Sequence, residues 1–168
     1  MPLIFVDCEA YGGCPGTGRM TEFGAVEFKS RKTFHGVILE TTPDPSNPAV
    51  PLPYPGMTDA MYYAEKAMPV FDDFARWLLA LGNGRHVMVS DNPAFDFQWI
   101  NDGFLRTRGK NPFGHSARRI SDFYAGLVGN FYETQHWKYL RRTPHDHNPV
   151  NDAMGNVEAF ERLLKGER

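Results

Sequence analysis

A short apolar strand that leads straight into two carboxylates constrains this chain more than any other feature. Residues 3–6 read Leu-Ile-Phe-Val and are followed by a glycine-rich stretch, which is typical of a central strand buried on both faces. Asp7 and Glu9 follow this run. Residues two apart in a strand share a face, so the alpha carbons of this pair lie about 6 to 7 Å apart with both side chains on one side. Two neighbouring anions at the edge of a core repel each other unless a cation lies between them, so the pair indicates a metal site.

The rest of the chain predicts a single α/β domain over residues 1–168. Residues 20–28 and 33–39 predict an antiparallel meander with the first strand, and further strands are expected over 86–90 and 118–121. Helices are expected over 69–81, where Pro69 reads as the first helical residue, over 94–105 and 122–128, and from Asn148-Pro149 onward. Strands first, followed by helices mixed with strands, indicate a central mixed β-sheet flanked by α-helices.

The segment from 42 to 56 is unlike the rest, because six of the thirteen prolines of the chain fall within it. Proline removes a backbone donor, so this segment predicts an extended, irregular covering loop rather than a helix or a central strand. A linker between two domains is the alternative. The role of its Pro-rich part, residues 43–55, stays open.

Composition excludes several classes of protein. The net charge of −2 gives no global basic field, so a nucleic-acid partner must be held locally. Cys8 and Cys14 have neither a metal-knuckle nor a disulfide-framework spacing, and a reducing, cytoplasmic location is expected. No run approaches the roughly 18 apolar residues of a membrane span, and we expect no membrane partner.

An isolated Asp-x-Glu pair is more often a solvated strand end than a metal site, so the interpretation depends on the remaining acids. Asp96 lies in an Asn-Pro-Ala-Phe-Asp sequence directly after a predicted strand, and His147 and Asp152 lie at the start of the final helix. An all-carboxylate set suits a hard cation such as Mg²⁺ or Mn²⁺ better than zinc.

With these motifs in order, the chain resembles the DEDDh 3'-5' exonucleases of the ribonuclease H-like superfamily. The strand ending Asp7-x-Glu9, the Asn92-to-Asp96 motif and the His147-to-Ala153 motif match the family's three motifs, and residues 22–26, Glu-Phe-Gly-Ala-Val, resemble its second strand. The resemblance implies a ribonuclease H-like fold and hydrolysis with two divalent cations, Mg²⁺ or Mn²⁺.

The resemblance also implies a role for each matched residue. Asp7 bridges both ions, Glu9 and Asp152 complete the shell of the first ion, and Asp96 acts directly or through water. His147 takes the proton from the attacking water, as an imidazole can near neutral pH. His145 competes with it, but only His147 has the four-residue gap to the acid.

The chain departs from the family's pattern in two places. Ala10 stands where the family often has Thr, and Ser90-Asp91 stands where it often has Gly-His. Neither change removes a metal ligand or the base. Both changes affect residues that the resemblance implies lie beside the terminal nucleotide.

A basic and aromatic segment, residues 135–142, precedes the expected base. Lys138, Arg141 and Arg142 are candidates to hold phosphates, and Trp137 or Tyr139 to stack on bases. The alternative is an amphipathic helix that buries Trp137 and keeps a solvated basic face. The full set of candidate substrate contacts is Ala10, Tyr11, Asn92, Lys138, Arg141 and His145.

The sequence therefore predicts a stand-alone exonuclease that acts on single-stranded 3' ends and releases 5'-mononucleotides. RNA is favoured over DNA by analogy with compact exoribonucleases of the family. A DNA-directed proofreading or repair exonuclease is one alternative. A catalytically inactive module that binds 3' ends is another, although such a module needs neither the base nor the complete acidic set. We expect a homodimer, since compact relatives often form one.

Overall fold

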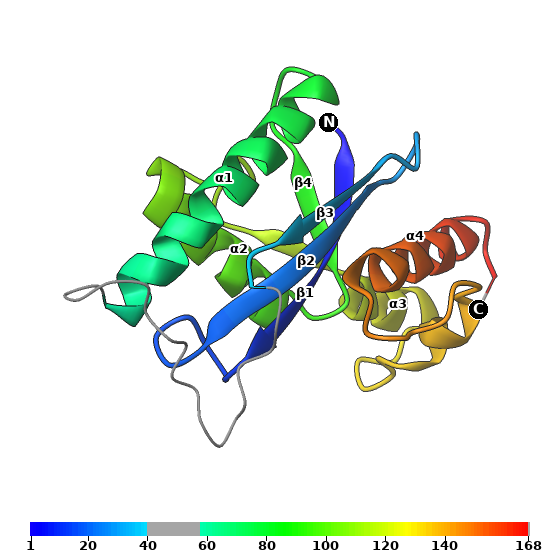
Figure 1. Ribbon diagram of the computed structural model, residues 1–168. Coiled ribbons are helices and arrows are strands. Elements are labelled where there is room, and N and C mark those ends of the chain that lie inside the picture. The colour runs from blue at the N-terminus through cyan, green and yellow to red at the C-terminus, as the bar shows by residue number, and fades with distance from the viewer. Residues whose placement is uncertain (40–57, 168) are drawn as a thin grey trace.

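The computed structural model describes residues 1–39 and 58–167, drawn in colour in Figure 1. The predicted covering loop at 42–56 lies outside the described residues. The elements in chain order are β1 (Leu3–Tyr11), β2 (Arg19–Glu27), β3 (Thr33–Val37), α1 (Asp59–Ala80), β4 (Val87–Ser90), α2 (Pro93–Arg108), β5 (Ala117–Arg119), α3 (Ile120–Val128), the 3₁₀ helix η1 (His136–Leu140) and α4 (Pro149–Leu164).

The sheet has the order β3-β2-β1-β4-β5. β2 pairs antiparallel with both β1 and β3, whereas β4 pairs parallel with β1 and with β5. The predicted meander and mixed sheet are therefore confirmed. The apolar run at 3–6 belongs to the central strand, whose Ile4, Phe5 and Val6 are fully buried.

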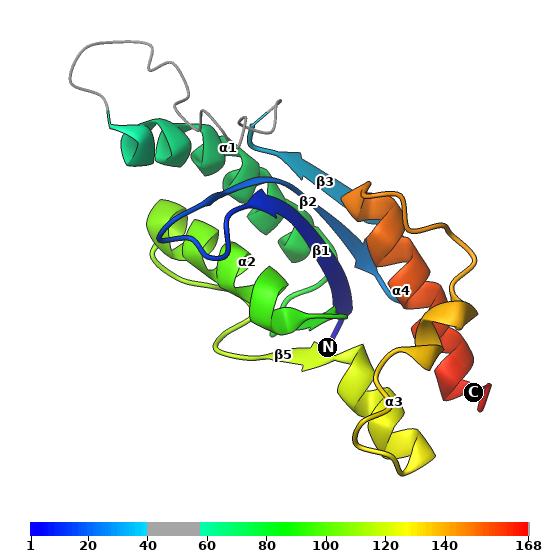
Figure 2. The same cartoon turned by 90° about the horizontal axis from the view of Figure 1, so that it is seen from below.

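Helices cover both faces of the sheet, with α1 and α2 on one face and α3 and α4 on the other (Figure 2). Side chains alternate along β1, so Ile4, Val6 and Cys8 pack in the core under α1 and α2, and Phe5 packs in the core under α4. Asp7 and Glu9 share the parity of Phe5. The acidic pair therefore faces the side of the sheet that α4 covers.

β1 extends beyond the apolar run at residues 3–6, as far as Tyr11. Asp7 pairs with Gly24 and Glu9 with Glu22 in the ladder to β2, and the register shifts between Glu9 and Ala10. The two acids thus lie inside a hydrogen-bonded strand, and the glycine loop begins only after Tyr11. The ladder to β2 holds their alpha carbons in register, whereas the pairing of β1 with β4 ends at Phe5.

The prediction that a helix begins at Pro69 was wrong. α1 begins ten residues earlier, with Thr58 as its N-cap, and Pro69 lies inside the helix. A proline at a first helical position and a proline inside a helix look alike in a sequence. Burial decides between them here, because Ala67 before the proline and Phe71 after it both pack into the core that α1 shares with the sheet.

The start of α4 lies directly on β2 at Gly24. A Cβ built on this glycine would lie 2.2 Å from the carbonyl carbon of Pro149, the first residue of the helix. Asn148 caps the helix through its side-chain oxygen, which accepts from the backbone N–H groups of Val150 and Asn151. The missing side chain at position 24 therefore lets the first turn of α4, which carries Asp152, approach the sheet.

We expect Gly24→Ala to lower the free energy of unfolding by about 1 to 3 kcal/mol or more, because the added methyl group meets backbone rather than a movable side chain. Urea denaturation followed by circular dichroism measures this change. Gly126→Ala is the matched control, since nothing lies within 4 Å of a Cβ at that helical position. Equal stability of the two variants would contradict the close approach of α4.

Candidate active site

Five carboxylates from distant parts of the chain meet beside the central strand. Oxygens of Asp7, Glu9 and Asp152 lie within 4.8 Å of one another, and so do oxygens of Asp7, Asp91 and Asp96. Asp7 belongs to both groups. The four acids that the sequence singles out as metal ligands therefore come together, and Asp91 joins them.

Asp96 is held in place by hydrogen bonds from two strands. Its Oδ1 accepts from the backbone N–H of Cys8 at 3.1 Å, and its Oδ2 accepts from the hydroxyl of Ser90. The residue is buried in the first turn of α2, where the helix dipole favours an anion. These bonds join the start of α2 to β1 and to the end of β4.

Asp152 is buried in the first turn of α4. Its Oδ1 accepts from the backbone N–H of Asp146 at 3.3 Å. Its Oδ2 lies 2.6 Å from Nδ1 of His145 but makes no hydrogen bond of good geometry. A buried carboxylate oxygen in this state is suited to bind a cation.

Two histidines lie at the open side of the cluster. His147 is exposed and has a left-handed backbone, with φ of 62°, directly before the cap of α4. Its Nδ1 lies 3.8 Å from Oε1 of Glu9, and its ring centre is 4.8 Å from that of His145. Both rings therefore stand beside the acids, and His145 has the shorter contact with a carboxylate.

Burial and crowding make three of the acids, Asp7, Glu9 and Asp96, harder to ionise. Burial, together with the charges of Asp96 and Asp152, raises the pKa of Asp7 to about 9. Burial also raises the pKa of Asp96 to about 7, although the Ser90 hydroxyl opposes the shift. The pKa of Glu9 is raised by burial as well, against the attraction of His147. A bound cation would relieve this repulsion.

The donor set fits divalent metal ions. Every carboxylate in the two groups offers an oxygen, the ligand atom that Mg²⁺ and Mn²⁺ prefer. Asp7 is the one acid among these that contributes to both groups. The buried Oδ2 of Asp152 supplies an oxygen that no protein hydrogen bond occupies.

Asp91 links this cluster to the basic segment that follows α3. Its Oδ2 lies 3.0 Å from Nζ of Lys138 and 3.4 Å from a guanidinium nitrogen of Arg141. Its backbone oxygen accepts from Nε of Arg119 at 3.1 Å. The sequence analysis noted Asp91 only as a departure from the family's pattern and did not predict that it joins the acids. Its position directly after β4 and directly before the second motif could have indicated this.

The basic segment divides into buried and exposed side chains. Trp137 is buried, and its indole N–H lies within hydrogen-bonding distance of the Ser121 hydroxyl and the Thr134 carbonyl. The side chain of Arg141 is only 11% exposed and donates to Asn156 at 2.5 Å. The structure thus gives Trp137 and Arg141 packing partners inside the protein and leaves Tyr139 exposed.

The other candidate substrate contacts flank the acids along the chain. Ala10 and Tyr11 are the last residues of β1 and pair with Met20 and Arg19. Asn92 is the exposed N-cap residue of α2, and its backbone N–H donates to the Ser90 hydroxyl at 2.9 Å. Ala10 and Tyr11 therefore directly follow Glu9 on β1, and Asn92 stands four residues before Asp96, at the start of the helix that carries this acid.

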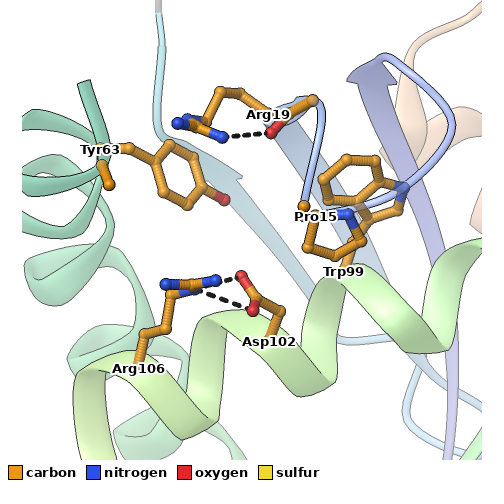
Figure 3. A pocket seen from close by; sticks show the side chains of 9 residues that line it. Pro15, Arg19, Tyr63, Trp99, Asp102 and Arg106 are labelled. Atoms are coloured by element: carbon orange, nitrogen blue, oxygen red, sulfur yellow. Dashed lines mark hydrogen bonds and ion pairs between the residues drawn. The ribbon is translucent and has the colours of Figure 1, made fainter.

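A separate cavity of about 120 Å³ opens between the β1–β2 loop, α1 and α2 (Figure 3). The guanidinium of Arg19 lies over the ring of Tyr63, 5.6 Å from its centre, and Arg106 donates to both oxygens of Asp102 at 2.8 Å. None of the five clustered acids lines this cavity. It is therefore distinct from the acidic site.

The fold is that of the DEDDh exonucleases. The nuclease domain of 3'hExo, a DEDDh family member bound to rAMP, matches with a TM-score of 0.66 at 13% identity, over 98% of this chain and 92% of that one. Escherichia coli exonuclease I in complex with a dA16 oligonucleotide matches with a TM-score of 0.54 at 15% identity, over 99% of this chain and 41% of that one. The predicted fold class is confirmed.

In sequence, the chain is 27% identical over 173 aligned residues to the 3'-5' DNA exonuclease Cap18 of Escherichia coli, covering 97% of this chain and 91% of the relative. No protein-family model matches the chain. The resemblance drawn from the motifs is thus confirmed, since the relative is named a 3'-5' exonuclease and the structural neighbour a DEDDh family member.

Within residues 1–39 and 58–167, no helix is both long and apolar enough to cross a membrane.

The raised pKa values of Asp7 and Asp96 predict how the metal-free protein responds to pH. A carboxyl group whose pKa is raised on folding stabilises the folded state below its ordinary pKa of 3.8, and this contribution is lost as pH rises through the folded pKa, about 7 for Asp96 and about 9 for Asp7. We therefore expect the Tm in EDTA to fall between pH 5 and pH 9. Asp7→Asn should flatten this fall and raise the Tm at pH 9.

Differential scanning fluorimetry across this pH range provides the measurement. Asp73→Asn, a substitution of an exposed acid on α1, serves as the control and should keep the wild-type slope. A Tm that rises with pH in wild type and in Asp7→Asn alike would contradict the electrostatic account of the cluster.

Proposed function

We propose that this chain is a metal-dependent 3'-5' exonuclease that hydrolyses the terminal phosphodiester bond of a single strand and releases a 5'-mononucleotide. The observation that carries the proposal is the meeting of Asp7, Glu9, Asp96 and Asp152 beside the central strand of a DEDDh-type fold. Four buried or half-buried acids in a small volume cost folding free energy, and a cation-dependent reaction gives a reason for that cost.

In this proposal two divalent cations would share Asp7, Glu9 and Asp152 would complete the set at the first, and Asp96 would act directly or through water. When bound, the cations supply an activated water and charge stabilisation at the scissile phosphate. His147 accepts the proton of the attacking water. Its support is an exposed ring beside Glu9, where solvent and a substrate phosphate can reach it. His145, at 2.6 Å from Asp152, is the competing base.

For the substrate we infer single-stranded DNA as the first choice. The relative that matches over nearly the whole chain is named a DNA exonuclease, and a structural neighbour holds a dA16 oligonucleotide. RNA, which the sequence alone favoured, remains the alternative, and 3'hExo bound to rAMP supports keeping it. Lys138 is proposed to contact a phosphate, and Ala10, Tyr11, Asn92 and His145 the terminal nucleotide.

The same proposal keeps a single catalytic domain over residues 1–168 and a homodimer. Sedimentation velocity tests the dimer: a species near 19 kDa at all concentrations would exclude it, since that is the mass of one chain.

The decisive experiment is cleavage of 12-nucleotide DNA and RNA single strands, labelled at either end, with Mg²⁺, Mn²⁺ or EDTA. We expect stepwise shortening from the 3' end that needs metal. Asp7→Ala should reduce the rate at least 1,000-fold because it removes an acid common to both groups. His147→Ala should lower kcat about 100- to 10,000-fold.

Asp122→Ala, a change of an exposed acid on α3, is the matched control and should retain the wild-type rate. Retained binding of 3' ends without cleavage in any metal would favour the end-binding module instead. A loss in His145→Ala larger than in His147→Ala would move the base to His145.

Asp91→Asn tests the link between the acids and Lys138. The amide keeps the shape but loses the ion pair at 3.0 Å, so Lys138 is held less firmly. We expect KM for a single strand to rise about 3- to 10-fold with kcat within about twofold, and Lys138→Met to do the same. Because both changes break one interaction, the double variant should show no further loss; additive losses would contradict the link.

A further inference from the structure

Three aromatic rings that follow α3 in the chain are turned out into solvent. Phe131 is 85% exposed, Tyr132 is 90% exposed and Tyr139 is 82% exposed. All three fall within nine residues, on the loop after α3 and on η1. Aromatic rings that are this exposed make few packing contacts within the protein. Several of them on one short segment indicate a binding surface.

The segment that carries these rings is held by hydrogen bonds. The side-chain oxygen of Asn130 accepts from the backbone N–H of Tyr132 at 3.1 Å, and Glu133 accepts from the backbone N–H groups of Gln135 and His136. The buried indole of Trp137 joins the segment to α3. A loop fixed in this way presents its rings at a small cost in conformational entropy.

The exposed segment is continuous with the acidic site. Tyr139 follows Lys138 directly, and Lys138 forms the ion pair with Asp91, whose carboxylate lies among those of Asp7 and Asp96. In Figures 1 and 2 the chain between α3 and α4 runs on the side of the sheet that α4 covers, which is the side that the acidic pair faces.

We infer that Phe131, Tyr132 and Tyr139 form a stacking surface for bases of the single strand upstream of the bond that is cut. This inference rests on the proposed function and adds to it a preference for strands longer than a few nucleotides. Every base has a π-face, so stacking of this kind holds a strand without reading its sequence.

The chemistry of the patch favours nucleic acid over a protein partner. Its exposed apolar groups are aromatic, and basic side chains stand beside them: Lys138 next to Tyr139, and the exposed Arg142 three residues further on. Exposed rings suit the faces of bases, and the cations around Tyr139 suit phosphates. The one acid among the rings, Glu133, is engaged by the backbone of its own loop.

The test compares Phe131→Ala/Tyr132→Ala with wild type on a DNA dinucleotide and on a 12-nucleotide single strand. We expect KM for the longer strand to rise about 10-fold or more, because each stacked base contributes to binding, while dinucleotide kinetics stay within about twofold. Tyr139→Ala should act in the same direction. Leu79→Ala, which removes another exposed apolar side chain on α1, is the control and should change neither substrate.

A second readout does not depend on cleavage. Fluorescence anisotropy of a labelled 12-nucleotide strand in EDTA measures binding alone, and the double alanine variant should bind it about 10-fold more weakly than wild type. Phe131→Leu/Tyr132→Leu keeps apolar area but not the rings, so it should bind as weakly as the alanine variant.

Several outcomes would overturn the inference. Unchanged anisotropy and unchanged KM for the longer strand would remove the stacking surface while leaving the exonuclease intact. An equal rise in KM for the dinucleotide and for the longer strand would mean that the rings act on the terminal nucleotide instead. Self-association of the wild type that the double alanine variant abolishes, with unchanged binding of the strand, would assign the patch to a second copy of this chain. Strand binding that depends on the rings, without any cleavage, would overturn the proposed function but keep the surface.

Discussion

Repulsion among carboxylates is the constraint around which this structure is built. Five acids bring their oxygens close together, and burial raises the pKa values of Asp7 and Asp96 far above the ordinary range. Such a cluster would spread apart unless each carboxylate were attached to an element that cannot move. The central strand is fixed by its ladder to β2 and the start of α4 by the side-chain cap of Asn148. The first turn of α2 is tied to β1 by Asp96 itself, which accepts from the backbone N–H of Cys8.

Two local features make this arrangement possible. Gly24 has no side chain at the point where α4 meets β2, so the turn carrying Asp152 reaches the acids of β1. Lys138 and Arg141 offset part of the excess negative charge by pairing with Asp91. The same pairing fixes η1 beside the cluster. Acidic site and basic segment are therefore joined by ion pairs into one electrostatic unit.

Much of the fold and of the acidic set could be predicted, because both leave local patterns. An apolar run followed by acids two residues apart indicates a strand and its shared face, and motif spacing brings in Asp96 and Asp152. Prediction was wrong where a local signal has two meanings. Pro69 has the chemistry of a first helical residue, yet core packing carries α1 through it. Nothing local distinguishes Trp137, which is buried, from Tyr139, which is exposed two residues later.

The sequence by itself determined which chemical groups are available: a carboxylate set for hard cations, two histidines before the last helix and a basic, aromatic segment. Only the tertiary structure decided how those groups are used. It buried Arg141 against Asn156, turned Phe131, Tyr132 and Tyr139 outward, and brought Asp91 into the acidic cluster. The physical reason is that residue type and spacing are local properties of the chain, whereas burial and ion pairing depend on neighbours far away in it, such as Arg141, which lies 50 residues from Asp91.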